Sequence, residues 1–124
     1  MSDHVFAIDD DPSLLRLITA FLKTEGFRVA AFESPVAALQ EMADPAEPNP
    51  LAVILDLNMP VMDGREFYHA ARAAGLTGPV LILSAYGAAA ARKELGAEAA
   101  MSKPFDGDVL ASTVRQLLTT GMDN

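Results

Sequence analysis

The chain alternates between two hydrophobic patterns, short continuous apolar runs and longer segments with apolar residues at helical spacing. Continuous apolar strands that alternate with helices are typical of a parallel sheet covered on both faces. The pattern therefore predicts a doubly wound α/β domain with right-handed crossovers. The apolar runs predict five strands, at residues 5–8, 28–32, 51–55, 80–83 and 97–101. The other segments predict five helices, at residues 12–25, 35–43, 63–74, 88–95 and from 107 onward.

Residues that favour helix starts and stops mark several of the predicted helix ends. Pro12 follows Asp11 and Pro35 follows Ser34, and proline suits the first helical position, so Asp11 and Ser34 are the predicted N-caps. Gly26 supplies the stop of the first helix. The helical spacing predicts the apolar faces of the first and last helices as Leu14, Leu17, Ile18, Phe21 and Leu22, and as Val109, Leu110, Val114, Leu117 and Leu118.

The composition limits what this chain can do. It has 124 residues, with 17 acidic and 9 basic side chains and a formal net charge of −8. The length suits a single domain over residues 1–124, with a core at about 4–119. The acidic balance argues against direct binding of nucleic acid or of an anionic membrane. Since the sequence has no cysteine and no segment that resembles a signal peptide or a membrane span, we expect a cytoplasmic location.

Polar residues follow four of the five predicted strands. Asp9 and Asp10 follow the first strand, Asp56 the third, Ser84 the fourth and Lys103 the fifth. Ligands of open α/β sheets bind beyond the carboxyl ends of the strands. These five side chains are therefore the candidate site residues.

The candidate carboxylates need a counter-charge. If the first and third strands are neighbours, Asp9, Asp10 and Asp56 lie close together. Two unit charges 4 Å apart repel by about 4 kcal/mol at an effective dielectric of 20, so three ionised carboxylates cannot sit together unaided. Mg²⁺ fits this demand because it binds one or two carboxylates together with waters and phosphate oxygens. Lys103 adds a positive charge and Ser84 a hydroxyl donor, which indicates a pocket for a phosphoryl group beside the metal.

Four segments carry a more specific signal: Asp9-Asp10, the string from Ile54 to Gly64, Leu83-Ser84-Ala85 and Lys103-Pro104-Phe105. In order and spacing they resemble the receiver domain of bacterial two-component response regulators, and the resemblance covers nearly the whole chain. It implies a flavodoxin-like sheet with strand order 2-1-3-4-5 and a role in two-component signal transduction.

The resemblance assigns roles in phosphoryl transfer. It implies that Asp56 is the phosphoacceptor, which attacks a phosphohistidine of a histidine kinase or of a histidine phosphotransfer protein. Ser84 would donate to one phosphoryl oxygen and Lys103 would pair with another. The Lys103-Pro104 bond is cis in the family. Such a chain is not an enzyme, although it assists its own phosphorylation and dephosphorylation.

The resemblance also implies how Mg²⁺ is bound. Asp10 would be a direct ligand and its neighbour Asp9 would act largely through water. Asp56 and the backbone carbonyl of Asn58 would complete the ligands that the protein supplies.

Two departures from the family pattern affect signal output. Ala100 stands where the family usually has an aromatic residue that swings inward on activation. The interval from Ser84 to Lys103 is about one helical turn shorter than usual, which shortens the fourth helix. Tyr86 either shields the site or packs over its loop. We therefore expect ordinary phosphorylation chemistry and unusual signal transmission.

Two alternatives stay open at this point. The departures favour a phosphorylation-independent interaction module that keeps the pocket as a relic. A haloacid-dehalogenase-like phosphatase also uses a strand-end aspartate, but this chain has Asn58 where that family has its general acid. The downstream protein target, the choice between a monomer and a weak dimer, and any output domain beyond Asn124 are not set by the sequence.

Overall fold

The computed structural model describes residues 4–44, 46, 49–59 and 62–122, and the side chains of these residues up to 119. Pro60 and Val61 of the predicted motif lie outside the described residues. Strands and helices alternate along the chain, as predicted. The strands are β1 (His4–Ile8), β2 (Arg28–Phe32), β3 (Ala52–Asp56), β4 (Val80–Ser84) and β5 (Ala99–Ser102). The helices are α1 (Pro12–Thr24), α2 (Pro35–Ala43), α3 (Gly64–Ala73), α4 (Ala88–Leu95) and α5 (Gly107–Met122).

The five strands form one parallel sheet in the order β2-β1-β3-β4-β5. β1 lies between β2 and β3, and its Phe6 is opposite Ala30 on one side and Val53 on the other. From β1 the chain first adds β2 on one side and then adds β3, β4 and β5 on the other side. Doubly wound sheets bind ligands at such a reversal of strand order. The predicted fold class and strand order are confirmed.

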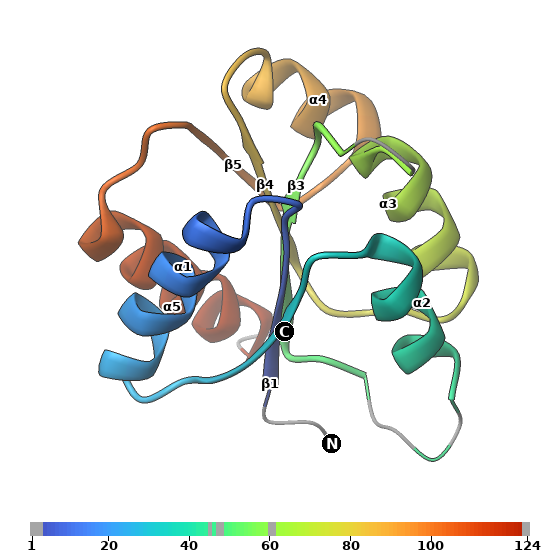
Figure 1. The fold of residues 1–124 in the computed structure, drawn as a ribbon, viewed down its shortest axis with the longest axis horizontal. Helices are drawn as coiled ribbons and strands as arrows, with labels where there is room; N and C mark the ends of the chain where they lie inside the picture. Colours follow the sequence, from blue (N-terminus) through green and yellow to red (C-terminus); the bar gives the residue numbers. More distant parts are fainter. Residues whose placement is uncertain (1–3, 45, 47–48, 60–61, 123–124) are drawn as a thin grey trace.

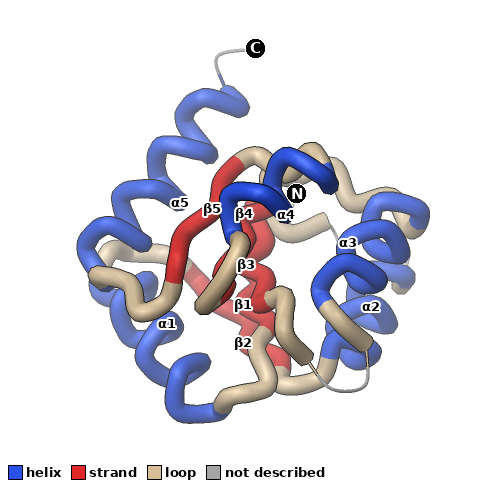
Figure 2. The backbone as a smooth tube through the Cα atoms, turned by 90° about the horizontal axis from the view of Figure 1, so that it is seen from above, coloured by secondary structure: helices blue, strands red, loops and turns tan. Residues whose placement is uncertain are grey.

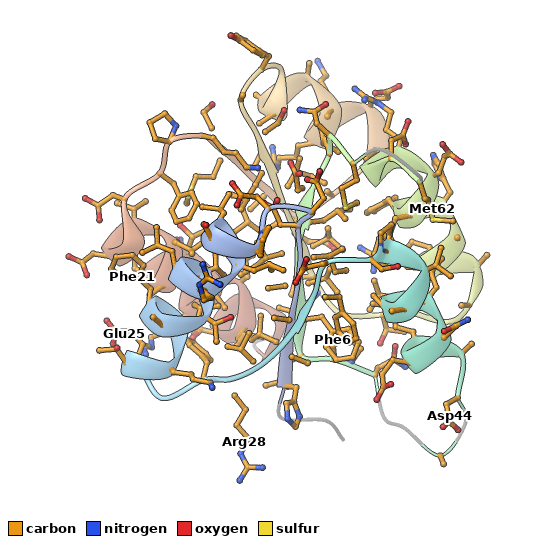
Figure 3. The ribbon with its side chains drawn as sticks, viewed as in Figure 1. Phe6, Phe21, Glu25, Arg28, Asp44 and Met62 are labelled. Carbon is orange, nitrogen blue, oxygen red and sulfur yellow. The ribbon has the colours of Figure 1, made fainter. Side chains whose placement is uncertain are left out.

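Helices cover both faces of the sheet. α1 and α5 lie on one face and α2, α3 and α4 on the other, with the sheet between them in Figures 1 and 2. Since side chains alternate along a strand, β1 supplies both cores. Phe6 and Ile8 pack on the side of α2 and α3, and Val5 and Ala7 pack on the side of α1 and α5. Figure 3 shows Phe6 and Phe21 on these opposite sides.

The predicted helix caps are present. Asp11 Oδ1 accepts hydrogen bonds from the backbone N–H groups of Ser13 and Leu14, at 3.0 and 3.3 Å. Ser34 Oγ accepts from the N–H of Ala37 at 3.3 Å. Both caps satisfy N–H groups that have no partner inside their helix.

The predicted buried face of α1 is partly wrong. Leu15, Ile18 and Leu22 are buried, whereas Leu17 is 47 % exposed. Apolar residues occupy positions 14, 15, 17 and 18, so periodicity alone does not fix which of them faces the sheet. Val109 of α5 is likewise 51 % exposed, contrary to the predicted face.

β5 begins two residues later than predicted. The N–H of Ala97 donates to the carbonyl of Arg92 at 3.1 Å and still belongs to the end of α4. The N–H of Glu98 then donates to Val80 at 3.2 Å, before the strand begins. α4 itself has 8 residues and is the shortest of the five helices. Within the described part of the chain, no helix is both long enough and apolar enough to cross a membrane.

Candidate functional site

The carboxyl ends of β1, β3, β4 and β5 meet at one edge of the sheet, the upper edge in Figure 1. Asp9 follows β1, Asp56 ends β3, Ser84 ends β4 and Lys103 follows β5. Among the described residues, Asp9, Asp56 and Ser84 are the buried polar or charged side chains, with exposed fractions of 1, 2 and 1 %. Buried charges are unfavourable unless they are paired, so their concentration here marks a built site.

Asp9, Asp10 and Asp56 form a carboxylate cluster. Each offers an oxygen, and the three oxygens all lie within 4.8 Å of one another. Asp9 and Asp56 are buried and Asp10 is exposed, so the cluster reaches solvent through Asp10. Hard oxygen ligands at this spacing suit a divalent cation such as Mg²⁺. The structure thus brings together the three carboxylates that the sequence predicted as metal ligands.

Lys103 bridges the two buried carboxylates. Its Nζ donates to Asp9 Oδ2 at 3.1 Å and to Asp56 Oδ1 at 3.0 Å. Its backbone N–H donates to the carbonyl of Ser84 at 2.9 Å, and the Lys103–Pro104 peptide bond is cis, as the resemblance implied. Burial lowers the pKa of Lys103, but the hydrogen bonds and charges of Asp56 and Asp9 outweigh burial and raise the pKa overall. Lys103 is therefore a protonated counter-charge.

The two oxygens of Asp56 differ in their surroundings. Oδ1 accepts from Lys103 Nζ and, at 3.3 Å, from the backbone N–H of Asn58. No hydrogen bond from the described residues reaches Oδ2, so the lone pairs of this oxygen are available to a metal ion or to a phosphorus atom. Burial raises the pKa of Asp56 and the charge of Asp9 adds to the rise, while the hydrogen bond from Lys103 opposes it.

The Ser84 hydroxyl is held by the loop that follows β4. Its Oγ donates to the carbonyl of Tyr86 at 2.7 Å and accepts from the N–H of Tyr86 at 3.2 Å. It also accepts from Asn58 Nδ2 at 3.4 Å. Because a hydroxyl has one proton to donate, a phosphoryl oxygen bound to Ser84 has to replace the Tyr86 carbonyl as the acceptor.

Gly64 holds the start of α3 against the end of β3. A Cβ at this position would lie 2.6 Å from Leu57 Cα and 2.7 Å from the Asp56 carbonyl oxygen. The N–H of Gly64 donates to the Leu57 carbonyl at 2.9 Å. The absence of a side chain therefore lets the helix approach the backbone that carries Asp56.

Gly64→Ala is expected to lower the free energy of unfolding by about 3 kcal/mol, because the contacts that a methyl group would meet are backbone atoms with little room to move. Urea unfolding followed by circular dichroism measures the loss. Gly26→Ala is the control, since a Cβ there meets nothing within 4 Å and strains only the left-handed backbone at φ +90°. A smaller loss for Gly64→Ala than for Gly26→Ala would contradict the steric explanation.

Two residues near the site depart from the expected pattern. Ala100 is half-buried on β5 and packs against the core on the side of α3 and α4. A methyl group has no rotamers, so it cannot act as a swinging switch. Tyr86 is 88 % exposed, so its ring neither shields the site nor packs over the loop, the two roles considered from the sequence.

Sequence reasoning missed the hydrogen bonds that hold Ser84. The Asn58 side chain could have been suspected, because it follows Asp56 by two residues at a strand end. The Tyr86 carbonyl leaves no signal in the sequence, since every residue has one. Asn58 reaches the site through its N–H and its amide, and metal binding by its carbonyl stays a prediction. The structure brings together the five strand-end side chains that the sequence selected: Asp9, Asp10, Asp56, Ser84 and Lys103.

Residues 5–115 match the family described as the response regulator receiver domain. The chain is 36 % identical over 120 residues to the transcriptional regulatory protein PrrA of Mycobacterium tuberculosis, which covers 94 % of this chain and 50 % of that protein. It is 34 % identical over 122 residues to the transcriptional regulatory protein GlrR of Escherichia coli, covering 93 % of this chain and 26 % of that protein. The chain thus spans half or less of the length of these relatives.

Solved structures with the same fold cover nearly the whole chain. A response regulator receiver protein from Burkholderia phymatum has 30 % sequence identity and a TM-score of 0.84, over 95 % of this chain and 96 % of that one. The chemotaxis protein CheY4 of Vibrio cholerae has 27 % identity and a TM-score of 0.81, over 94 and 99 % of the two chains. The family match over residues 5–115 includes the five strand-end residues Asp9, Asp10, Asp56, Ser84 and Lys103.

Proposed function

The chain belongs to the response regulator receiver domain family of two-component systems, and on this premise we propose that it accepts a phosphoryl group on Asp56. The observation that carries the proposal is the state of this carboxylate. It is 2 % exposed, Lys103 Nζ lies 3.0 Å from its Oδ1, and its Oδ2 takes no hydrogen bond from the described residues. The donor is a phosphohistidine of a histidine kinase or of a histidine phosphotransfer protein.

In the proposed step, Asp56 Oδ2 attacks the phosphorus atom of the phosphohistidine. The O–P bond forms as the P–N bond breaks, and the imidazole nitrogen keeps the electron pair and takes up a proton from solvent. Lys103 Nζ neutralises the charge that develops on the phosphoryl oxygens. Ser84 donates to another phosphoryl oxygen after its proton leaves the Tyr86 carbonyl. The product is an aspartyl phosphate.

Mg²⁺ fits the carboxylate cluster. Asp9, Asp10, Asp56 and the backbone carbonyl of Asn58 would hold the ion, because hard oxygen ligands suit it. When bound, Mg²⁺ neutralises charge on the phosphoryl oxygens. Asp9 Oδ1 already accepts from the N–H of Asp11 at 3.0 Å, and its Oδ2 is paired with the site lysine. These bonds favour a role for Asp9 through water rather than as a direct ligand.

Mg²⁺ is expected to raise the melting temperature of the metal-free protein. An ion that binds the folded state alone stabilises it by about 2.7 kcal/mol at 100 times its dissociation constant. Thermal unfolding with MgCl₂ and with EDTA, at constant ionic strength, measures the shift. Asp10→Asn removes the exposed ligand and should reduce the shift, whereas Asp11→Asn keeps a good N-cap and should not. Equal shifts in the two variants would count against the metal site.

Phosphorylation itself is tested by incubating the purified chain with phosphoramidate and MgCl₂ and measuring its intact mass. The expected result is the addition of one phosphoryl group, which hydroxylamine removes and which does not form in EDTA. If neither phosphoramidate nor a phosphorylated histidine kinase modifies the chain, the proposed function is wrong.

The chain acts in the cytoplasm as a phosphoacceptor rather than as a turnover enzyme, either as a monomer or as a weak dimer. PrrA and GlrR are named transcriptional regulatory proteins, but the net charge of −8 favours protein contacts over direct DNA or membrane contacts for these 124 residues. Phosphorylation changes its affinity for a downstream protein target.

Ala100 favours a second candidate, an interaction module that works without phosphorylation. A methyl group at this half-buried position removes the aromatic rotamer through which the family transmits the signal. The test compares the affinity for the partner protein in the wild type, Asp56→Asn and Asp56→Glu. Equal affinities in the three, with a wild type that is phosphorylated, would favour this candidate.

A further inference from the structure

A groove of about 550 Å³ lies between α1 and β2, at the open side of the sheet. Its position is separate from the carboxylate cluster, since the cluster residues do not line it. In Figure 2, α1 and β2 lie side by side at the edge of the sheet that has no further strand. The groove residues used below are Leu15, Arg16, Thr19, Ala20, Lys23 and Ala31.

The outer edge of β2 can accept another strand. Within the described residues, β2 pairs with β1 alone. The carbonyl of Phe32 accepts from the N–H of Asp9 at 3.1 Å, so the peptide groups of Phe32 and Ala30 face β1. Because backbone groups alternate along a strand, those of Val29 and Ala31 face outward. An extended segment laid along the groove would meet the outward N–H and C=O groups of Ala31, the β2 residue that lines it.

The groove is positively charged in an acidic protein. Arg16 and Lys23 lie two turns apart on α1 and line the groove, with Glu33 as its one acidic lining residue. Neither cation has a carboxylate partner among the described residues, and Arg16 donates only to Ser13 Oγ at 3.5 Å. Lys23 is in the last turn of α1, where the helix dipole favours a cation, but mid-helix Arg16 has no such local reason. Arg65, Arg72, Lys103 and Arg115 each have a carboxylate partner, whereas Arg92 and Lys93 of α4, like the groove cations, have none among the described residues.

The groove is lined by small side chains and by a threonine whose hydroxyl has no hydrogen-bond partner among the described residues. Ala20 and Ala31 leave room that larger side chains would fill. The half-buried Thr19 has a buried Oγ1 with no hydrogen-bond partner in the described part of the chain, which is unfavourable for a buried hydroxyl.

The dimensions set the length of the occupant. Pro12 and Lys23 at the ends of the groove are separated by about 16 Å along α1, at 1.5 Å per residue. A strand of five residues spans a similar length, about 16 Å at 3.3 Å per residue. We propose that the groove binds an extended acidic segment of a partner protein, about five residues long, which adds to the outer edge of β2.

The test uses a seven-residue peptide of alternating Glu and Val, titrated into the ¹⁵N-labelled chain and followed by NMR. The expected shifts map to residues 12–23 and 28–33, saturate with peptide concentration, and weaken as salt is added. A peptide of alternating Lys and Val should cause none of them. Shifts confined to other residues, or equal binding of the basic peptide, would overturn the proposal.

Variants separate charge recognition from strand addition. Arg16→Glu with Lys23→Glu should weaken binding of the Glu/Val peptide at least tenfold. Arg92→Glu with Lys93→Glu makes the same charge change on exposed positions of α4 and should leave the affinity within a factor of two.

Ala31→Pro removes an outward N–H of β2 and should also weaken binding, because proline lacks the donor that an added strand needs. Circular dichroism verifies that this variant is folded. Equal loss in the α4 control, or full binding by Ala31→Pro, would overturn the proposal. A different outcome would assign the outer edge of β2 to a second copy of this chain. In that case the chain dimerises in sedimentation, Ala31→Pro abolishes the dimer, and the peptide does not bind.

Discussion

Asp56→Asn is expected to abolish phosphorylation of the chain by phosphoramidate and by a phosphorylated histidine kinase. Asparagine keeps the shape of the side chain but replaces the nucleophilic Oδ2 with an amide group. Both oxygens of Asp9, the other buried carboxylate of the described site, are in hydrogen bonds, whereas Oδ2 of Asp56 is in none. Oδ2 is therefore the buried carboxylate oxygen that is placed to attack phosphorus. The rate is measured by intact-mass spectrometry over time in saturating MgCl₂.

Asp63→Asn provides the matched control for this variant. Asp63 caps α3 through a hydrogen bond from the N–H of Glu66 at 2.9 Å, and asparagine is an equally good N-cap. Asp63→Asn makes the same chemical change seven positions from Asp56 and should leave the phosphorylation rate within a factor of two of the wild-type rate. Phosphorylation of Asp56→Asn at the wild-type rate would show that another residue accepts the phosphoryl group.

The same Asp56→Asn substitution should stabilise the metal-free protein at neutral pH. Burial, with the charge of Asp9, raises the pKa of Asp56 above its ordinary value of 3.8 in the folded state. The folded state therefore favours the protonated form of Asp56. The stabilisation that protonated Asp56 gives is fully present below pH 3.8 and is lost as pH rises through the higher pKa of the folded state. Asparagine does not ionise and avoids this loss. Urea unfolding in EDTA should show a more stable variant at pH 7, with a smaller difference near pH 4.

Lys103→Met is expected to slow phosphorylation by about 10²-fold, a typical effect of removing one group that stabilises transition-state charge. Lys103 Nζ contacts both Asp9 and Asp56, and no other basic side chain of the described residues is paired with either carboxylate. Methionine has a similar length without the charge. The initial rate of mass change with phosphoramidate in saturating MgCl₂ measures the loss.

Lys93→Met is the control for Lys103→Met, because Lys93 is exposed on α4 and its substitution makes the same change in net charge. Its phosphorylation rate should equal that of the wild type. Lys103→Arg should fall between Lys103→Met and the wild type, since it keeps the charge but has a planar group in place of a compact ammonium. Equal rates for Lys103→Met and Lys93→Met would remove Lys103 from the proposed mechanism.

The fold could be predicted because its strands are strongly marked. The apolar runs at 51–55 and 80–83 suit only fully buried positions, and Pro12 and Pro35 fix two helix starts. The rotation of α1 could not be predicted in the same way, because several adjacent positions are apolar and the sheet selects among them. The start of β5 depends on the backbone hydrogen bond from Ala97 to α4, which composition does not reveal.

The site was predictable where side chains carry the chemistry. Asp56, Ser84 and Lys103 each stand at a strand end, and parallel strands bring such ends to one edge. The backbone contacts of the site could not be predicted from the sequence. The Tyr86 carbonyl that accepts the Ser84 proton and the exposure of the Tyr86 ring both depend on the path of one loop.

The central claim is that Asp56 is the residue that accepts the phosphoryl group, and chemical mapping tests it most directly. Sodium borohydride reduces an aspartyl phosphate to homoserine, which peptide mass spectrometry locates in the sequence. After treatment with phosphoramidate and MgCl₂, we expect homoserine at position 56 and unmodified aspartate at positions 9 and 10. Homoserine at Asp9 or Asp10, or none at position 56 in a chain whose mass shows that it is phosphorylated, would contradict the account.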